Sequence, residues 1–335
     1  MKKVYITNTA SIDSISGISD NTLPENIAQP GGNRIACLEP DYKEYVADAG
    51  TRRRMSRAVK MGVAAAVHCL AQTEKKPDAI ITATGLGCLG DTEKFLKTLI
   101  ENNEQLLNPT PFIQSTFNTV GAQVAIGQSN NGYNMTYVHR GFAFENALTD
   151  ALLQLREGEA ESILAGSYEE TTDTSFEIMQ RLGFWRQGAK CGEGAHFFTL
   201  STQANDVNPV ELKGVLSILT EDKNLLNDKL SAFLQANNTT TDEIDTLVSG
   251  SLASPDSFYA IIENRFPNAN LLRFKHLTGD YQTVSAFATY LAVQILQEES
   301  IPAFLLAKNG NRKSCKLLVY NHYLGTNHSF VLLGK

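Results

Sequence analysis

The sequence predicts an α/β protein with a layered αβαβα architecture made of two similar halves. Short apolar runs alternate with stretches of helical period, the pattern of helices packed against buried sheets. The order of elements restarts after the polar stretch 202–209, so we predict an N-terminal half at 1–205 and a shortened C-terminal half at 206–335. Each half holds one helix that is apolar on most sides, which indicates burial on most sides. We predict that these two helices lie between two sheets.

In the N-terminal half, the strands are expected at short apolar runs and the helices at stretches with a spacing of three to four residues. The predicted strands are Val4–Thr7, Ala79–Thr82, Met135–Val138, Ser162–Ala165 and His196–Leu200. The predicted helices are Arg53–Leu70, Thr92–Glu101, Val120–Gln128, Phe142–Leu155 and Thr174–Arg181. Phe142–Leu155 is the apolar helix, with Phe144, Leu148, Ala151 and Leu155 at helical spacing.

The C-terminal half repeats a similar order of elements. The predicted strands are Glu211–Leu219, Thr246–Ser249, Lys316–Val319 and Ser329–Leu333, and the predicted helices are Leu225–Ala236, Pro255–Phe266 and Gln282–Gln297. The last of these helices is the second apolar one, with Val284, Ala288, Leu291 and Ile295 along one stripe.

Composition narrows the functional classes. The formal net charge of −7 argues against general nucleic-acid binding, which usually needs a basic surface. Five cysteines without a CxxC pair suit neither a disulfide framework nor a zinc site, and a reducing cytoplasm is the expected location. The start of the chain alternates apolar and polar residues, unlike an export signal. The most apolar later segment, Ala286–Leu296, is shorter than the ~20 residues of a membrane span, so none is expected.

The segment TYVHRGFAFENAL, residues 136–148, is predicted to be a strand that turns directly into a helix at Gly141. Helix-start amide groups stabilise an anion, so enzymes often place a nucleophilic Cys or Ser at such a junction. Gly141 has no side chain that a neighbouring base could activate.

Five ordered blocks resemble the β-ketoacyl-acyl carrier protein synthases, enzymes of the thiolase fold. The blocks are RRRMSRAVKMGVAAA (52–66), TGLGCLGDTEKFL (84–96), PTPFIQSTFNTVGAQVAI (109–126), LREGEAESILAGSYEE (155–170) and CGEGAHFFTLS (191–201). The resemblance implies the thiolase fold for nearly the whole chain. It also implies that the position of the family's catalytic cysteine, counted back from Gly158, is Gly141.

Three further catalytic features depart from the family. The segment SGSLASPDSF (249–258) has no histidine where the family has its first one, and Ser251 is the approximate counterpart. The segment KHLTGD (275–280) keeps Lys275 but has Asp280 at the second histidine position, and an aspartate does not donate as a neutral imidazole does. The family's glycine-rich loop, which supplies an oxyanion N–H and a gate, is shortened here to NHYLGTN, with Asn321 and Gly325 retained.

Other residues have two readings each. Phe142 and Phe144 flank the vacated position and either narrow an acyl pocket or pack in the core. His276 and Asp280 would share a face if their segment were helical, and the favoured reading is a capping or hydrogen-bonding role for Asp280 at the start of the following helix. By resemblance, the arginine-rich helix would dock an acidic acyl carrier protein, and the alternative is a solvated or salt-bridged helix face. The candidate docking residues are Arg52, Arg53, Arg54 and Arg57.

The leading hypothesis is a subunit without condensing activity, similar to a chain length factor, that pairs with an active ketosynthase. The pathway would use acyl carrier protein to make fatty acids, polyketides or aryl polyenes, and the interface is expected at PTPFIQSTFNTVGAQVAI and NMTYVHR. A competing hypothesis is an acyltransferase, thioesterase or decarboxylase that uses Cys88, Ser115 or His139. A third is a homodimeric acyl-binding protein. No cofactor or metal is predicted.

Overall fold

The computed structural model describes residues 2–15, 17–18, 23–24, 31–73, 75–186, 188–205, 207–252 and 257–335. Helices and strands alternate in the predicted order. The first part contains β1 (Tyr5–Asp13), β2 (Gly17–Ile18), α1 (Ala49–Arg54), α2 (Arg57–Leu70), β3 (Ala79–Thr84), α3 (Leu89–Glu101), α4 (Pro109–Gln114), α5 (Thr119–Gln128), β4 (Tyr133–Val138), the 3-10 helix η1 (Arg140–Phe142), α6 (Ala143–Glu157), β5 (Ser162–Glu169), α7 (Asp173–Arg181) and β6 (Gly194–Ser201).

The second part contains the elements of the smaller half. They are β7 (Val210–Leu219), α8 (Lys223–Ala236), η2 (Thr241–Glu243), β8 (Thr246–Ser249), α9 (Ser257–Asn264), β9 (Asn270–Arg273), α10 (Lys275–Thr278), α11 (Val284–Glu298), η3 (Ala303–Leu305), β10 (Leu306–Lys308), β11 (Lys316–Tyr323) and β12 (Asn327–Gly334).

The strand order demonstrates the duplication. Strands pair in the order β10-β9-β8-β11-β12-β7-β1-β6-β5-β3-β4. Without the short β2 and β10, each half has its first strand beside its fifth, followed by its fourth, second and third. The two sheets meet only at β1 and β7, through the pairs Tyr5↔Glu211 and Ile6↔Val210. The boundary at 205/206 remains a prediction, because this contact joins both parts into one sheet.

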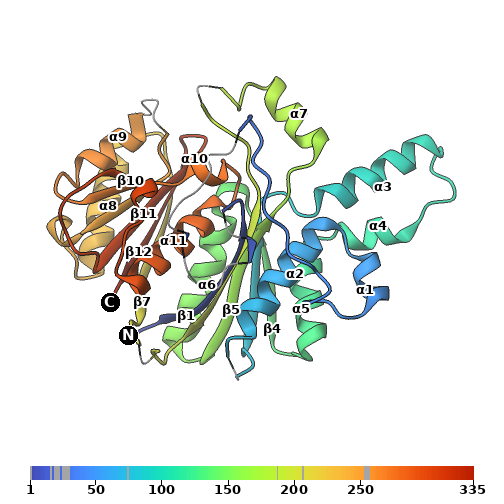
Figure 1. Ribbon diagram of the computed structural model, residues 1–335, viewed down its shortest axis with the longest axis horizontal. Helices are drawn as coiled ribbons and strands as arrows, with labels where there is room; N and C mark the ends of the chain where they lie inside the picture. The colour runs from blue at the N-terminus through green and yellow to red at the C-terminus, as the bar shows by residue number, and fades with distance from the viewer. Residues whose placement is uncertain are drawn as a thin grey trace.

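The two apolar helices lie in the middle of the layers, as predicted. α6 contacts β3 and β5 of one half and β7 of the other, while α11 contacts β1 and β6 as well as β11 and β12. α2 and α5 cover the outer face of the first sheet, and α8 and α9 that of the second (Figure 1). Every residue from Val284 to Leu296 in α11 is buried. This arrangement confirms the αβαβα layers of the thiolase fold.

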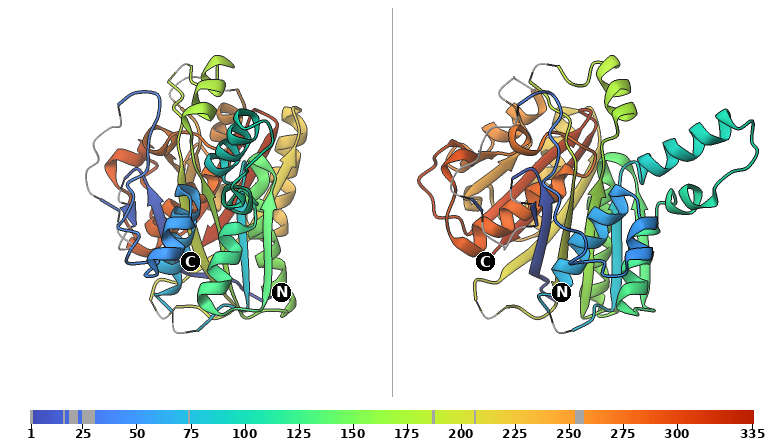
Figure 2. Two further views of the ribbon diagram at one scale, coloured as in Figure 1. Left: turned by 90° about the vertical axis from the view of Figure 1, so that its right-hand side faces the viewer. Right: turned by 45° about the vertical axis from the view of Figure 1, so that its right-hand side comes forward.

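Local signals set the ends of the site-bearing elements. α6 ends at Gly158, which adopts φ +84° and donates its N–H to the Gln154 carbonyl oxygen at 3.0 Å, a conformation that favours glycine. α7 begins with a capping box between Thr172 and Ser175. α3 and α4 form an arm that projects away from the sheets (Figure 2).

Three predicted boundaries were wrong or incomplete. The helix predicted at Arg53–Leu70 is two helices, because Met55 and Ser56 take extended backbone conformations between α1 and α2, and the Met55 side chain is buried. The strand β9 was not predicted. The helix predicted from Pro255 begins at Ser257, and residues 253–256 lie outside the described part of the chain.

Candidate functional site: a vacated active centre

Gly141 lies in η1, between the end of β4 and the start of α6. A Cβ atom added to it would lie 2.3 Å from Cβ and 2.7 Å from Cγ of Tyr323. Tyr323 is the last residue of β11, and the turn after it uses positive φ angles at Leu324 and Gly325. The shortened loop is therefore a hairpin turn, and its tyrosine fills the space that a nucleophile side chain would need.

This packing predicts the behaviour of Gly141→Cys. The new side chain would overpack the contact with Tyr323, so the variant should lose about 1–3 kcal/mol in the free energy of unfolding. Adding Tyr323→Ala should recover most of that loss. Urea unfolding of both variants, with Tyr323→Ala alone as the control, measures the coupling. If Gly141→Cys is as stable as the parent, Tyr323 does not occupy the position firmly.

Asp280, which the resemblance assigns to the second histidine position, is held by an ion pair. Its Oδ1 lies 3.0 Å from Nζ of Lys275, a nearly buried side chain. Lys275 also donates to the Tyr259 hydroxyl at 3.2 Å, and that hydroxyl donates to Oδ1 of Asn321 at 2.9 Å. Of the predicted capping or hydrogen-bonding role, the capping part was wrong: Thr283 is the N-cap of α11, and Asp280 is bound to Lys275 because α10 ends at Thr278, shortly before it. The retained lysine thus holds the replaced histidine position in a structural network.

Ser251, which the resemblance assigns to the first histidine position, also forms a side-chain hydrogen bond. Its hydroxyl donates to Oε1 of Glu263, which accepts a second hydrogen bond from Ser249 at 2.7 Å. Glu263 belongs to α9 and lies 3.6 Å from Nη2 of Arg273. The Ser251 hydroxyl is therefore hydrogen-bonded to a side chain of α9.

The predicted pocket residues separate into two groups. Phe142 is buried and stacks on His139 with ring centroids 5.5 Å apart, and Phe144 is buried against Phe198 at 5.7 Å. Both contacts favour core packing for these two phenylalanines. Gly325 lines an open hollow of about 470 Å³ together with Lys275, Asp280, Tyr259 and His322. Asn321 is buried and accepts a hydrogen bond from Tyr259, one of the residues that line this hollow.

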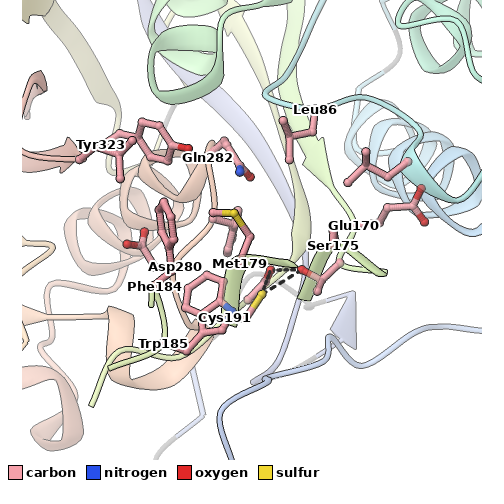
Figure 3. A pocket seen from close by; sticks show the side chains of 15 residues that line it. Leu86, Glu170, Ser175, Met179, Phe184, Trp185, Cys191, Asp280, Gln282 and Tyr323 are labelled. Atoms are coloured by element: carbon pink, nitrogen blue, oxygen red, sulfur yellow. Dashed lines mark hydrogen bonds between the residues drawn. The ribbon is translucent and has the colours of Figure 1, made fainter. Parts of the chain in front are cut away.

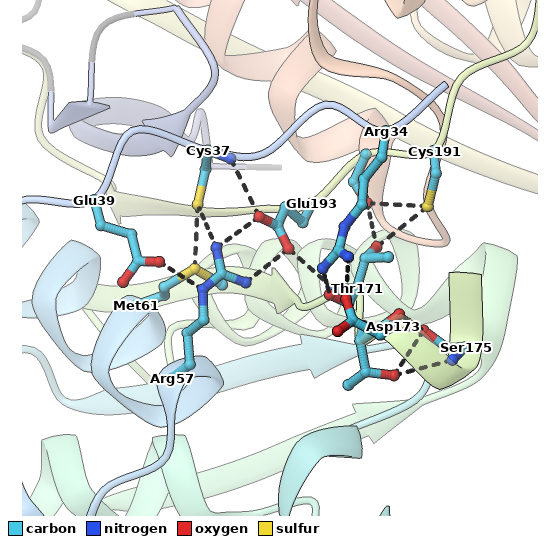
Figure 4. Close-up of polar contacts among 12 residues, drawn as sticks. Arg34, Cys37, Glu39, Arg57, Met61, Thr171, Asp173, Ser175, Cys191 and Glu193 are labelled. Carbon is cyan, nitrogen blue, oxygen red and sulfur yellow. Dashed lines mark hydrogen bonds and ion pairs between the residues drawn. The ribbon is translucent and has the colours of Figure 1, made fainter. Parts of the chain in front are cut away.

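The four arginines have different surroundings (Figure 4 shows Arg57). Arg57 forms ion pairs with Glu39 at 2.5 Å and with the buried Glu193 at 2.6 Å. Arg52 donates to the carbonyl oxygen of Val46 at 2.6 Å. Arg53 and Arg54 are exposed. Carrier-protein docking remains a prediction, and Arg53 and Arg54 have the exposed guanidinium groups that it needs.

The nucleophile candidates of the enzyme hypothesis lack activation. Burial raises the pKa of the Cys88 thiol to about 12, and only a thiolate is a good nucleophile. The Ser115 hydroxyl donates to the Phe112 carbonyl oxygen at 2.8 Å, and His139 is exposed on the surface. The described residues contain no group of three or more His, Cys, Asp or Glu side chains that could hold a metal. Within the same residues, every helix is too short or too polar to cross a bilayer.

Glu169 at the end of β5 is the acid with the clearest shift. Burial raises its pKa to about 8, although the Gly85 amide and the Thr84 hydroxyl both donate to its Oε1. Between about pH 4.5 and 8 the folded state holds a proton that the unfolded state has lost, so stability falls as pH rises through this window, by up to about 1.4 kcal/mol per pH unit. Glu169→Gln should flatten that part of the stability profile measured by urea unfolding. An unchanged slope would show that Glu169 is not the group responsible.

Sequence reasoning missed three features of this region. They are the closure of Gly141 by Tyr323, the Lys275–Asp280 pair and a hollow beneath α7 lined by Trp185. The contact of Tyr323 with Gly141 joins segments more than a hundred residues apart in the sequence. The Lys275–Asp280 pair forms across a turn. The one sign of these contacts in the sequence was the retained Lys275, five residues before Asp280.

Comparisons with known proteins agree with this fold. Residues 42–192 match the family model for the N-terminal domain of beta-ketoacyl synthases. A search of curated protein sequences finds no match. Among solved structures, the ishigamide ketosynthase/chain length factor has a TM-score of 0.83 at 15% identity, covering 100% of this chain and 99% of the other. A ketosynthase (ApeO) in complex with its chain length factor (ApeC) from Xenorhabdus doucetiae has a TM-score of 0.74 at 15% identity, covering 99% and 98%.

Proposed function

Because residues 42–192 match the N-terminal domain of beta-ketoacyl synthases and the whole chain has the ketosynthase fold, we propose a non-catalytic role of the chain length factor type. In this role the chain pairs with an active ketosynthase. The pathway elongates acyl groups on an acyl carrier protein, toward fatty acids, polyketides or aryl polyenes.

The contact of Tyr323 with Gly141 is the observation that carries the proposal. A condensing enzyme needs a nucleophile at the helix start and space beside it for the acyl group. Here Gly141 supplies no nucleophile, and the Tyr323 side chain fills the space directly beside it. Asp280 and Ser251 are bound to Lys275 and Glu263, so neither histidine position offers a free group for proton transfer. Fold alone does not establish function, and it is these contacts that argue against condensation.

An exposed apolar surface supports the pairing. β4 is the last strand at its end of the sheet, so one of its edges has no neighbouring strand among the described residues. Exposed apolar side chains continue from this strand onto α5, α4 and the segment between them. They are Tyr133, Met135, Val138, Ile126, Phe112, Ile113 and Phe117. Exposed apolar side chains gathered on neighbouring elements next to an open strand edge are typical of a protein–protein interface.

Two neighbouring structures support a paired assembly. The chains named above come from structures of a ketosynthase with a chain length factor. Another neighbour is a type II polyketide synthase acyl carrier protein in complex with its ketosynthase, with a TM-score of 0.80 at 14% identity. At these identities the likeness shows the fold, and the assembly is carried to this chain only as part of the proposal.

The test is intact-mass spectrometry after incubation with acyl-loaded carrier protein, with this chain alone and with a candidate ketosynthase. We expect acylation only on the ketosynthase and co-elution of both chains as one complex. A mass gain on this chain alone would overturn the non-catalytic role and favour the enzyme hypothesis. A stable homodimer that ignores every ketosynthase offered and still retains acyl chains would favour the acyl-binding hypothesis.

A further inference from the structure

The part of the chain that supplies the exposed apolar surface is almost free of charge. The segment 105–149, which holds α4, α5, β4, η1 and the start of α6, contains only two Asp, Glu, Lys or Arg residues, whereas these types make up 19% of the chain. They are Arg140 and Glu145, and Glu145 is fully buried. Arg140 is therefore the one charged side chain that this segment exposes.

Arg140 lies at the carboxyl end of the open edge strand β4. The last residue of β4, Val138, pairs with Thr84 of β3. The Phe117 ring lies near the same end, because a Cβ atom added to Gly87, three residues after Thr84, would contact it. Val138 and Phe117 are both exposed. This end of β4 thus combines apolar side chains with one arginine, the charged residue that is enriched among the strongest contributors to protein–protein binding.

Arg140 has an unusual backbone and no ionic partner. It adopts φ +40°, in the left-handed region, where a residue with a side chain is strained. Strain of this kind is typical of functional positions. Among the residues that the structure describes, none forms an ion pair or a hydrogen bond with its guanidinium group. The cation is available to a partner chain.

Carboxylates of the neighbouring elements do not supply the missing partner. Glu169 is buried at the end of β5. Glu170 and Asp280 line the hollow beneath α7 (Figure 3). Asp150 of α6 is bonded at the opposite end of β4, where it accepts from the Tyr133 hydroxyl at 3.1 Å. A carboxylate for the arginine therefore has to come from another chain.

We propose that Arg140 binds an aspartate or glutamate of the ketosynthase and thereby selects that chain over a second copy of this one. The inference rests on the proposed function, because it takes the exposed apolar surface as the pairing surface. Two identical chains would present the same surface to each other. A self-pair would bury Arg140 without a partner or draw Asp150 away from Tyr133. Burying an unpaired cation is costly, so the arginine acts against the wrong partner.

The experiment is carbodiimide cross-linking of the full-length variant Arg140→Lys with a candidate ketosynthase. The reagent joins an amine to a carboxylate in direct contact: an amide bond forms, and the carboxylate oxygen leaves on the carbodiimide, which becomes a urea. We expect mass spectrometry to find position 140 linked to an Asp or Glu of the ketosynthase. Arg181→Lys is the matched control, because Arg181 pairs with Glu177 on α7 and should link only within the chain.

The affinity of the complex provides the second measurement. Arg140→Gln should weaken it at least about thirtyfold in calorimetric titration, because the carboxylate of the ketosynthase loses its cation. Arg181→Gln should bind like the parent chain, and circular dichroism confirms folding of each variant.

The outcomes separate this inference from the pairing itself. If the complex forms, either parent-like affinity of Arg140→Gln or the absence of any link from position 140 overturns the inference and leaves the pairing proposal intact. A link from position 140 to Asp150 of a second copy also overturns it and indicates self-association. If no ketosynthase co-elutes with the parent chain, the pairing proposal fails and this inference fails with it.

Discussion

Arg57→Ala is expected to lower the free energy of unfolding by about 2–4 kcal/mol, because it leaves the buried Glu193 carboxylate without its cation. Glu193 is only 1% exposed, and both of its oxygens bond to Arg57, at 2.7 and 2.6 Å. The Thr171 and Cys37 amides also donate to Glu193, at 3.0 and 3.2 Å, and these bonds remain in the variant. Arg57 itself is one-third exposed, so the expected loss is smaller than for a fully buried pair.

The pH dependence of the free energy of unfolding distinguishes the loss of the Arg57 charge from the loss of its packing. Arg57 and the two amides lower the pKa of Glu193 despite its burial. A carboxyl group with a lowered folded pKa stabilises the fold above its unfolded pKa of about 4.5, and this stability is lost as pH falls through the folded value. The difference between parent and Arg57→Ala should therefore shrink as the pH falls below about 4.5. Urea unfolding between neutral and acidic pH measures it.

Arg53→Ala is the matched control, because Arg53 is an exposed arginine on the neighbouring helix. It should change stability by no more than about 0.5 kcal/mol. If carrier-protein docking is correct, this control variant should still weaken binding of the acidic partner. Should Arg57→Ala be as stable as the parent, the Glu193 pair would not be a structural element, and Arg57 would return to the docking candidates.

The layered fold was predictable because burial leaves a direct record in the sequence. A helix buried on most sides has to be apolar on most sides, and the two helices around Phe144 and Leu291 have this property. In the structure each of them follows the third strand of its half, although β9, the third strand of the second half, was not predicted. The break at Met55 and Ser56 left no such record, because one helix and two helices separated by two extended residues have almost the same apolar spacing.

From the sequence, the candidate site was predictable only as a set of positions at which the family's catalytic residues are replaced. Gly141, Ser251 and Asp280 could be located by resemblance, because each lies in a recognisable segment. What occupies the vacated space could not be predicted, since Tyr323 reaches Gly141 from a hairpin at the other end of the chain. Asp280 was assigned to a helix cap from local spacing, whereas a buried lysine five residues earlier offered a stronger electrostatic partner.

Met135→Arg should weaken the complex with the ketosynthase at least a hundredfold, about 2.7 kcal/mol. Met135 is 40% exposed on β4, so an arginine there is tolerated while the chain is alone. On pairing, the guanidinium group would be buried without a partner, which costs far more than the lost methionine contacts. Size-exclusion chromatography with light scattering and calorimetric titration measure the complex.

Leu219→Arg is the control for this variant, because Leu219 is also an exposed apolar residue of a strand but lies on β7, in the other half of the sheet. It should bind the ketosynthase like the parent chain, and both variants should unfold at the parent's urea midpoint. If Leu219→Arg breaks the complex and Met135→Arg does not, the partner docks on the second half. A different protein would then have to cover the edge of β4, because an apolar strand edge that is open to solvent promotes aggregation.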